Sequence, residues 1–206
     1  MLEVNRKNQR TWAIVIIVAL LGSMVLALAG CSADPLAEQF RSGDNKNYIA
    51  GDGTVTEYAI SERPVAGEWS GITESGLQLD SSALLGSVTV LNFWYAGCAP
   101  CRAEAPDLVA LHEKYSSQGV NFVGVNVRDT AETALAFDRK FGIQFPSVMD
   151  AQSGAVSLAF TGVVSPSAVP TTLIIDAEGR VASRVLGRIE PSILSTLIET
   201  VLEESK

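Results

Sequence analysis

The sequence predicts an α/β fold in which a central mixed β-sheet is flanked by helices on both faces. Two observations lead to this prediction. Strand patterns and helical patterns alternate from Val88 onward, and two consecutive strand patterns joined by a tight turn precede the last helix. Alternating strands and helices predict parallel strands that are covered by helices, whereas the hairpin before the last helix adds antiparallel strands. The expected order is therefore strand, helix, strand, helix, an insertion, two strands and a helix.

The first strand and helix of this core follow from the side-chain pattern. The run from Val88 to Tyr95 is rich in β-branched and aromatic residues, which is typical of a strand buried on both faces. Gly97 ends the run, and residues 99–116 then carry apolar side chains at helical spacing. Cys98 and Cys101 therefore stand where a buried strand passes into a helix.

A second strand, a second helix and an insertion come next. The run from Val120 to Val127 has the composition of another buried strand. Asp129-Thr130 can cap a helix whose apolar positions continue to Phe141. A short extended piece over residues 145–150 and a short helix over residues 154–160 are expected to form the insertion.

The last three elements complete the sheet and cover it. Residues 170–176 predict a strand, and Ala177-Glu178-Gly179 forms a tight turn into a second strand over residues 180–186. The last helix is expected after Pro191, because apolar residues recur beyond it at helical spacing.

The chain before this core is polar and rich in turns. We expect residues 31–69 to form a flexible tether, within which Tyr58 and Ile60 suit a short edge strand. Residues 72–79 predict a small hairpin. The folded domain is therefore expected over residues 70–206.

The first 30 residues have the pattern of an export signal. Basic residues precede an apolar run over residues 12–29, and the run ends in Leu28-Ala29-Gly30-Cys31. This ending resembles the lipobox of bacterial lipoproteins, in which the cysteine is lipidated. We expect a signal peptide over residues 1–30 and a lipid on Cys31, with an uncleaved transmembrane helix as the alternative. Either arrangement holds the remaining chain on the extracytoplasmic side of the cell membrane.

The charge of the chain argues against nucleic acid as a partner. The formal net charge is −8, and basic residues do not cluster outside the extreme N-terminus. Binding nucleic acid requires a basic surface that displaces counterions from the phosphates. We expect no nucleic-acid partner.

The cysteines indicate redox chemistry. The chain has 3 cysteines, and lipidation would occupy Cys31. Cys98 and Cys101 are too close in sequence to join distant parts of a fold, so a redox pair is the better interpretation. A zinc site needs about four ligands, and His112 and Cys31 are the only further His or Cys side chains. A covalent haem site would need a histidine where Arg102 stands. We expect no cofactor beyond the redox-active Cys98–Cys101 disulfide.

The expected position of the pair suits thiol chemistry. Unpaired N–H groups and the helix dipole at a helix N-terminus favour a thiolate. Cys98 would lie at the mouth of the helix, whereas Cys101 would be shielded within its first turn. This arrangement allows one thiol to attack and the other to resolve.

Two stretches carry a resemblance to a known family. Residues 92–106 read NFWYAGCAPCRAEAP, and residues 169–172 read VPTT. Together they resemble thioredoxin-fold proteins, and more narrowly the membrane-tethered, extracytoplasmic TlpA/ResA-type thiol–disulfide oxidoreductases of the AhpC/TSA-like superfamily. The resemblance covers roughly residues 70–206. It implies a thioredoxin fold, with the central insertion of that branch at about residues 144–165.

The resemblance also implies roles for single residues. Cys98 would be the nucleophile, and Cys101 would resolve the mixed disulfide. Pro170 would follow a cis peptide bond and place the Val169 backbone where a substrate strand can pair. Pro100, between the cysteines, would tune the potential and contact substrate.

Four further positions carry expectations. Glu104 is either an active-site acid that shuttles protons or a first-turn carboxylate that complements the helix dipole. Trp94 is expected to flank the site, either as a substrate contact or as core packing. Asn92 stands where cytoplasmic thioredoxins carry a buried aspartate. His112 is expected on the solvated surface of the helix.

The function that the resemblance implies is that of an enzyme, a membrane-anchored thiol–disulfide oxidoreductase. It would reduce disulfides in exported proteins such as apocytochrome c, in cytochrome c maturation, and be recharged by a membrane thiol electron carrier. Two alternatives stay open, a disulfide-forming oxidase for exported proteins and a non-catalytic lipoprotein interaction module. Peroxidase chemistry is weaker, because Tyr95 stands where such enzymes carry a threonine.

Overall fold

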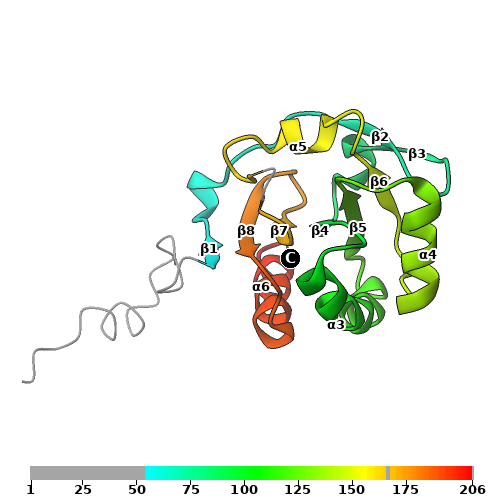
Figure 1. The fold of residues 1–206 in the computed structure, drawn as a ribbon. Helices are drawn as coiled ribbons and strands as arrows, with labels where there is room; N and C mark the ends of the chain where they lie inside the picture. The colour runs from blue at the N-terminus through cyan, green and yellow to red at the C-terminus, as the bar shows by residue number, and fades with distance from the viewer. Residues whose placement is uncertain (1–53, 166–167, 206) are drawn as a thin grey trace, which may run out of the picture. The chain divides into compact units, whose positions relative to one another are not determined.

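The computed structural model describes residues 54–165 and 168–205. They form a six-stranded mixed sheet with helices on both faces and a separate two-stranded sheet (Figure 1). The predicted fold class is confirmed. The expected signal peptide and Cys31 lie outside the described residues. Within the described part of the chain, no helix is both long and apolar enough to span a membrane.

The six-stranded sheet has the order β1-β8-β7-β4-β5-β6. Strands β4, β5 and β6 are parallel to one another, whereas β7 is antiparallel to β4, β8 to β7 and β1 to β8. The strands are β1 (Val55–Glu57), β4 (Thr89–Trp94), β5 (Asn121–Asn126), β6 (Ser147–Met149), β7 (Thr171–Ile175) and β8 (Val181–Leu186). The mixed pattern follows from the sequence, because helix α4 links β5 to the parallel β6 while a tight turn joins β7 to β8.

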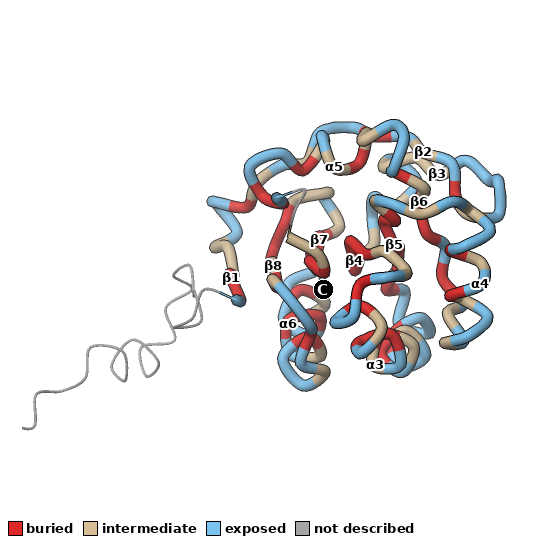
Figure 2. The backbone as a smooth tube through the Cα atoms, viewed as in Figure 1, coloured by how far each residue is buried: buried red, intermediate tan, exposed pale blue. Residues whose placement is uncertain are grey.

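Strand β4 is buried along its whole length, as its composition predicts (Figure 2). Successive side chains of a strand point to opposite faces. Leu91 and Phe93 therefore pack on one face, where helix α5 (Ala155–Ala159) contributes Val156 to the same cluster. Val90 packs on the other face, among side chains of α3 (Ala99–Ser116) and α6 (Pro191–Glu204). The strand that leads to Cys98 is thus fixed from both sides.

Helix α4 (Ala131–Phe141) begins and ends where its sequence predicts. The hydroxyl of Thr130 accepts a hydrogen bond from the Thr133 N–H at 3.4 Å and so caps the first turn. Gly142 ends the helix with φ of 76°, a left-handed conformation that glycine adopts without steric cost.

The folded body begins earlier than expected. β1 pairs with β8, and Arg63 and Trp69 are buried, so residues 54–69 of the predicted tether belong to the fold. The edge strand predicted around Tyr58 and Ile60 is also misplaced. It covers Val55–Glu57, and Ile60 begins the short 3₁₀ helix η1 (Ile60–Glu62). The local sequence pattern does not show where this strand lies, because its partner, β8, is far along the chain.

The predicted hairpin and insertion are both present. The hairpin consists of β2 (Ser70–Ile72) and β3 (Gln78–Asp80), and is followed by the 3₁₀ helix η2 (Ser81–Leu84). The insertion contains β6 and α5. The side chain of Asp150 accepts hydrogen bonds from the N–H groups of Val156 and Ser157 at 3.0 and 2.9 Å, which fixes the start of α5.

Candidate active site

Cys98 and Cys101 form a disulfide at the N-terminus of α3. Cys98 is the N-cap residue, and its sulfur accepts a hydrogen bond from the Cys101 N–H at 3.2 Å. A long helix places free N–H groups and the positive end of its dipole at this point. When the disulfide is reduced, both features stabilise a thiolate at Cys98.

The two cysteines differ in surroundings rather than in exposure. We expected Cys98 at the mouth of the helix and only Cys101 shielded, but both are buried, with 3% and 2% of their surfaces exposed. Gly97, Ala99 and Pro100, which flank Cys98, are exposed. Cys98 therefore lies just beneath the molecular surface, while Cys101 packs against the core.

The Val169–Pro170 segment lies beside Cys98, as the resemblance implies. The Val169–Pro170 peptide bond is cis, and the Val169 carbonyl oxygen lies 3.9 Å from the sulfur of Cys98. The Pro170 carbonyl oxygen accepts a hydrogen bond from the Gly187 N–H at 2.8 Å. A reduced Cys98 thiol could donate to the Val169 carbonyl oxygen at this position.

Glu104 is completely buried, in the second turn of α3. The expectation of a first-turn carboxylate that complements the helix dipole is therefore wrong. Its carboxyl accepts hydrogen bonds from Asn92 Nδ2 at 2.9 Å and from the Ile189 N–H at 3.0 Å. Burial raises the pKa of Glu104 to about 7, although these two hydrogen bonds oppose the shift.

Asn92 links Glu104 to the strand that follows Pro170. Its Nδ2 group also donates to the Thr172 hydroxyl at 3.0 Å, and all three side chains are buried. Thr172 was not a sequence candidate, although it is the second threonine of the quoted VPTT stretch. No local pattern shows which side chain faces Thr172, because Asn92 and Thr172 are brought together only by the pairing of β4 with β7.

Trp94 is packed into the core and is 5% exposed, so the expectation that it contacts substrate is not supported. Its Nε1 donates to the Ser147 hydroxyl at 3.1 Å, and its ring centroid lies 4.4 Å from that of Phe137. Gly124 permits this approach, since a Cβ there would lie 2.2 Å from the Ser147 hydroxyl. By contrast Pro100, in the first turn of α3, is exposed and available to a partner.

The turn before Cys98 is held by residues that sequence reasoning missed. The Asp129 carboxylate accepts a hydrogen bond from the Ala96 N–H at 2.6 Å, and Arg102 donates to the Ala96 carbonyl at 3.0 Å. The guanidinium of Arg128 lies 4.3 Å from the centroid of the Tyr95 ring. These contacts fix the backbone that presents Cys98.

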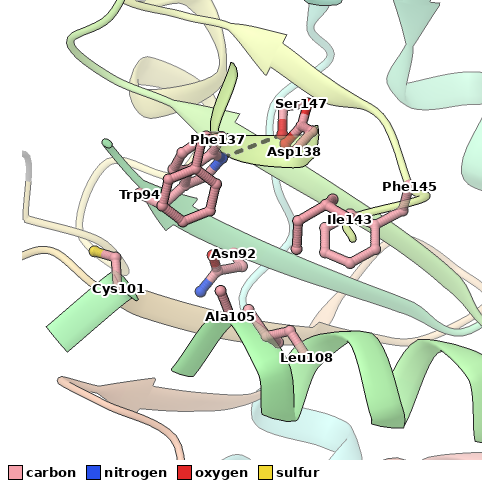
Figure 3. A pocket seen from close by; sticks show the side chains of 10 residues that line it. All are labelled: Asn92, Trp94, Cys101, Ala105, Leu108, Phe137, Asp138, Ile143, Phe145 and Ser147. Carbon is pink, nitrogen blue, oxygen red and sulfur yellow. Dashed lines mark hydrogen bonds between the residues drawn. The ribbon is translucent and has the colours of Figure 1, made fainter. Parts of the chain in front are cut away.

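A small cavity lies behind the cysteine pair, between α3, α4 and the sheet (Figure 3). Its volume is about 20 Å³. Its lining side chains are Asn92, Trp94, Cys101, Ala105, Leu108, Phe137, Asp138, Ile143, Phe145 and Ser147. Asp138 lies in α4, and its position in the helical pattern carries no functional signal.

His112 is not the solvated surface residue that was expected. It is half-buried, and its ring centroid lies 5.4 Å from those of both Phe122 and Phe145. Burial lowers the pKa of His112 below its ordinary value. The described residues contain no group of three or more His, Cys, Asp or Glu side chains placed to share a metal ion.

Known proteins with similar sequences include a thiol-disulfide oxidoreductase and a thiol:disulfide interchange protein. The chain is 34% identical over 120 residues to the thiol-disulfide oxidoreductase ResA of Bacillus subtilis, covering 58% of this chain and 64% of ResA. It is 30% identical over 117 residues to the thiol:disulfide interchange protein HelX of Rhodobacter capsulatus, covering 57% of this chain and 62% of HelX. Each match spans less than two thirds of the relative's length.

Solved structures give the same grouping. A secreted thiol-disulfide isomerase from Corynebacterium glutamicum superposes with a TM-score of 0.68 at 27% identity, covering 77% of this chain and 98% of that one. A DsbF homologue from Corynebacterium diphtheriae superposes with a TM-score of 0.64 at 29% identity, covering 76% of this chain and 99% of that one. These likenesses agree with the TlpA/ResA-type resemblance.

The family model described as the AhpC/TSA family matches residues 65–184, which include β4, the cysteine pair, the insertion and most of the β7–β8 hairpin. This match covers more than half of the chain. The chain therefore belongs to the AhpC/TSA family.

Proposed function

We propose that this protein is a thiol–disulfide oxidoreductase whose working group is the Cys98–Cys101 pair. The observation that carries the proposal is the position of the disulfide. It caps the N-terminus of α3, under exposed residues and beside the Val169 carbonyl oxygen. Similarity to ResA and HelX supports the same activity.

The reaction follows from this position. The Cys98 thiolate attacks one sulfur of a substrate disulfide, and the other substrate sulfur leaves as a thiolate that takes up a proton. Cys101 then loses its proton and attacks the Cys98 sulfur of the mixed disulfide. The second substrate sulfur is released and protonated. Two electrons have passed to the substrate, and the Cys98–Cys101 disulfide has formed.

Glu104 is suited to the proton transfers of this reaction. It follows Cys101 by three residues, so the two side chains project from the same side of α3. Its pKa of about 7 allows it both to accept and to release a proton near neutral pH. We assign Glu104 to proton exchange with the pair, and Val169, Pro170 and Pro100 to contact with substrate.

Reduction of insulin disulfides by the full-length chain, purified in detergent, tests the activity. Cys98→Ser removes the attacking sulfur and is expected to reduce the rate to the uncatalysed level. Cys101→Ser retains attack but cannot resolve, and should accumulate a covalent mixed disulfide. A wild-type protein without activity would favour the alternative of a non-catalytic interaction module.

We further propose a direction for the electron flow between this protein and its substrate. The resemblance to ResA favours a reductant of exported proteins, with apocytochrome c as the substrate in cytochrome c maturation and a membrane thiol carrier as the electron donor. The alternative is a disulfide-forming oxidase. Titration of the Cys98–Cys101 pair against glutathione separates them, because a potential near that of thioredoxin favours reduction, whereas one near that of DsbA favours oxidation.

We further propose that the chain is anchored to the bacterial cell membrane by a lipid on Cys31 and works on the extracytoplasmic side. The lipobox-like ending of the N-terminal apolar run supports this location. In membrane fractionation, the wild-type chain should partition into detergent, and mass spectrometry should find a lipid on Cys31. Cys31→Ser should block that modification. An unmodified Cys31 in the membrane fraction would instead support the transmembrane alternative.

A further inference from the structure

An apolar pocket lies at the end of β4 that is farther from the cysteine pair. Thr89 of β4 and Ile175 of β7 line it from the sheet, where they are opposite each other in the antiparallel register. Trp69 and Phe160 are buried and form part of its wall. Because β4 has 6 residues, about 17 Å of strand separates Thr89 from the turn before the cysteines. The mechanism proposed above does not use this pocket.

The Thr89 hydroxyl is an unpaired polar group on the pocket side of the sheet. Thr89 is 1% exposed, and its Oγ1 atom has no hydrogen-bond partner among the described residues. Alternate residues of a strand share one face, so Thr89 lies on the face of Leu91, which belongs to the same cluster as Trp69 and Phe160. Buried polar atoms in native proteins are nearly always paired. The unpaired hydroxyl therefore indicates a ligand group that can form a hydrogen bond.

The size of the pocket suits one aromatic ring. Its volume is about 130 Å³. An apolar cavity of about 150 Å³ binds benzene in another protein. Among amino-acid side chains, tyrosine combines an apolar ring with a hydroxyl group at its tip. A tyrosine ring in this pocket would contact Trp69 and Phe160, while its hydroxyl could pair with Thr89.

The rim of the pocket indicates that this ring belongs to a polypeptide. Val65 and Leu85 line the pocket, and they are 76% and 56% exposed. A single aromatic ring inside the pocket cannot also cover both of these side chains. Large apolar side chains that are exposed around a pocket are typical of protein interfaces, in which an aromatic anchor fills the pocket.

The charge around the pocket favours a basic partner. Glu68, Asp176 and Glu178 line it, whereas no lysine or arginine is among the described residues that do so. Arg180 pairs with Asp176 and Glu178 at 2.9 and 3.1 Å, but Glu68 is exposed and has no ion pair within the described part of the chain. A second copy of this chain, with its net charge of −8, or an anionic membrane surface would bring further negative charge to Glu68. A lysine or arginine of the partner would instead be attracted to it.

We propose that this pocket binds a partner polypeptide through a tyrosine side chain that has a lysine or arginine next to it. The ring lies between Trp69 and Phe160, its hydroxyl pairs with Thr89, and the basic side chain pairs with Glu68. Because the pocket and the cysteine pair lie at opposite ends of β4, the bound tyrosine leaves Cys98 free for disulfide exchange. The site is thus a docking site that is separate from the reaction.

Nuclear magnetic resonance of the oxidised, ¹⁵N-labelled full-length chain in detergent tests the site. The probe is a short capped peptide in which tyrosine and lysine stand side by side between glycines. We expect the indole N–H signal of Trp69, which lines the pocket, to shift saturably at millimolar peptide, and that of Trp94, near the cysteines, to stay in place. A peptide with alanine in place of tyrosine should leave both signals unchanged. No saturable shift of the Trp69 signal, or an equal shift with the alanine peptide, overturns the proposal.

Thr89→Val tests the assignment of the hydroxyl group. Valine has nearly the shape of threonine but cannot form the hydrogen bond. We expect this variant to bind the tyrosine peptide about two- to tenfold more weakly than wild type. A peptide with phenylalanine in place of tyrosine should bind the variant and the wild type equally. An unchanged affinity for the tyrosine peptide, or an equal loss with both peptides, overturns the proposal.

Glu68→Gln covers the case in which Thr89→Val does not fold, because Glu68 is exposed. At low salt we expect this variant to bind the tyrosine–lysine peptide about two- to fivefold more weakly. Glu113→Gln is the matched control, since Glu113 is an exposed carboxylate on α3 that does not line the pocket. No loss in Glu68→Gln, or an equal loss in Glu113→Gln, overturns the proposal.

The result of this test is independent of the proposed enzyme activity. Peptide binding is measured on the oxidised chain and requires no disulfide exchange. The Thr89→Val and Glu68→Gln variants should therefore reduce insulin at the wild-type rate. A wild-type chain that binds the peptide but does not reduce insulin would contradict the oxidoreductase function and still support the docking site.

Discussion

Two buried polar clusters lie at opposite ends of β4 and differ in how their carboxyl groups are paired. The site cluster consists of Asn92, Glu104 and Thr172, next to the cysteines. The ion cluster consists of Arg63, Asp176, Arg180 and Glu204. Arg63 donates to Asp176 at 3.0 Å and to Glu204 at 2.5 Å, and Arg180 contacts Asp176 at 2.9 Å.

The difference separates a cluster suited to chemistry from one that holds the fold together. In the ion cluster, arginines balance the buried charge and connect the segment after β1 to β7 and α6. In the site cluster, the donors to Glu104 are a neutral amide and a backbone N–H. Without a bonded cation, the carboxyl of Glu104 keeps its proton until near neutral pH. The two clusters therefore differ in the partners of their carboxyl groups, which are arginines in the ion cluster and neutral donors in the site cluster.

Removal of the ion cluster's central cation should have the largest effect. Arg63→Leu leaves the Asp176 and Glu204 carboxylates without their shared partner, and the Arg63 side chain is 5% exposed. Breaking a buried pair costs about 3–5 kcal/mol of unfolding free energy. Urea unfolding at pH 7 measures this loss, while the alkylation rate of reduced Cys98 in the folded variant should stay as in wild type.

Lys114→Met serves as its control, since the Lys114–Glu199 pair is half-exposed on both sides. Exposed pairs contribute little to stability, so this variant should unfold close to wild type. If Arg63→Leu also left the unfolding free energy close to that of wild type, the ion cluster would not be the cluster that stabilises the fold.

Glu104→Gln tests whether the site cluster titrates. The folded protein holds the Glu104 proton to about pH 7, against an ordinary value of 4.5, so the unfolded chain releases it first. Stability of the oxidised wild type therefore falls as pH rises from about 4.5 to about 7. The contribution of this residue is about 3 kcal/mol over that window.

The Gln variant lacks this titration. We expect the difference in unfolding free energy, variant minus wild type, to be about 3 kcal/mol larger at pH 8 than at pH 5. Denaturant unfolding of both proteins at the two pH values measures this difference. Parallel stability curves for the two proteins would mean that Glu104 does not titrate in the folded state, and the contrast between the clusters would fail.

Two buried threonines, one with a hydrogen-bonded hydroxyl and one without, give the smallest expected effect on stability. Thr172→Val removes an acceptor from buried Asn92 and should cost about 1–2 kcal/mol, because one amide hydrogen is left unpaired. Thr89 is equally buried on the neighbouring strand, yet its hydroxyl has no partner among the described residues. Thr89→Val should therefore be neutral or stabilising. Thermal unfolding of the two variants gives the comparison, and equal losses would contradict it.

Much of the fold could be predicted because the signals were local. The caps at Cys98 and Thr130, the turn at Gly142 and the buried run of β4 each need only neighbouring residues to define them. β1 could not be predicted, because only β8 gives this short segment its register. The burial of His112 likewise depends on Phe122 and Phe145, which come from other elements.

The sequence by itself determined the α/β order and the cysteine pair at the start of a helix, because both depend on the spacing of residues along one stretch of chain. Tertiary structure decided which side chains surround that pair. Pairing of β4 with β7 brings Thr172 to Asn92, and the packing of α3 and α4 brings Asp138 to the cavity behind Cys101. Burial and neighbours set the charge of a carboxyl group, and both are properties of the folded chain alone.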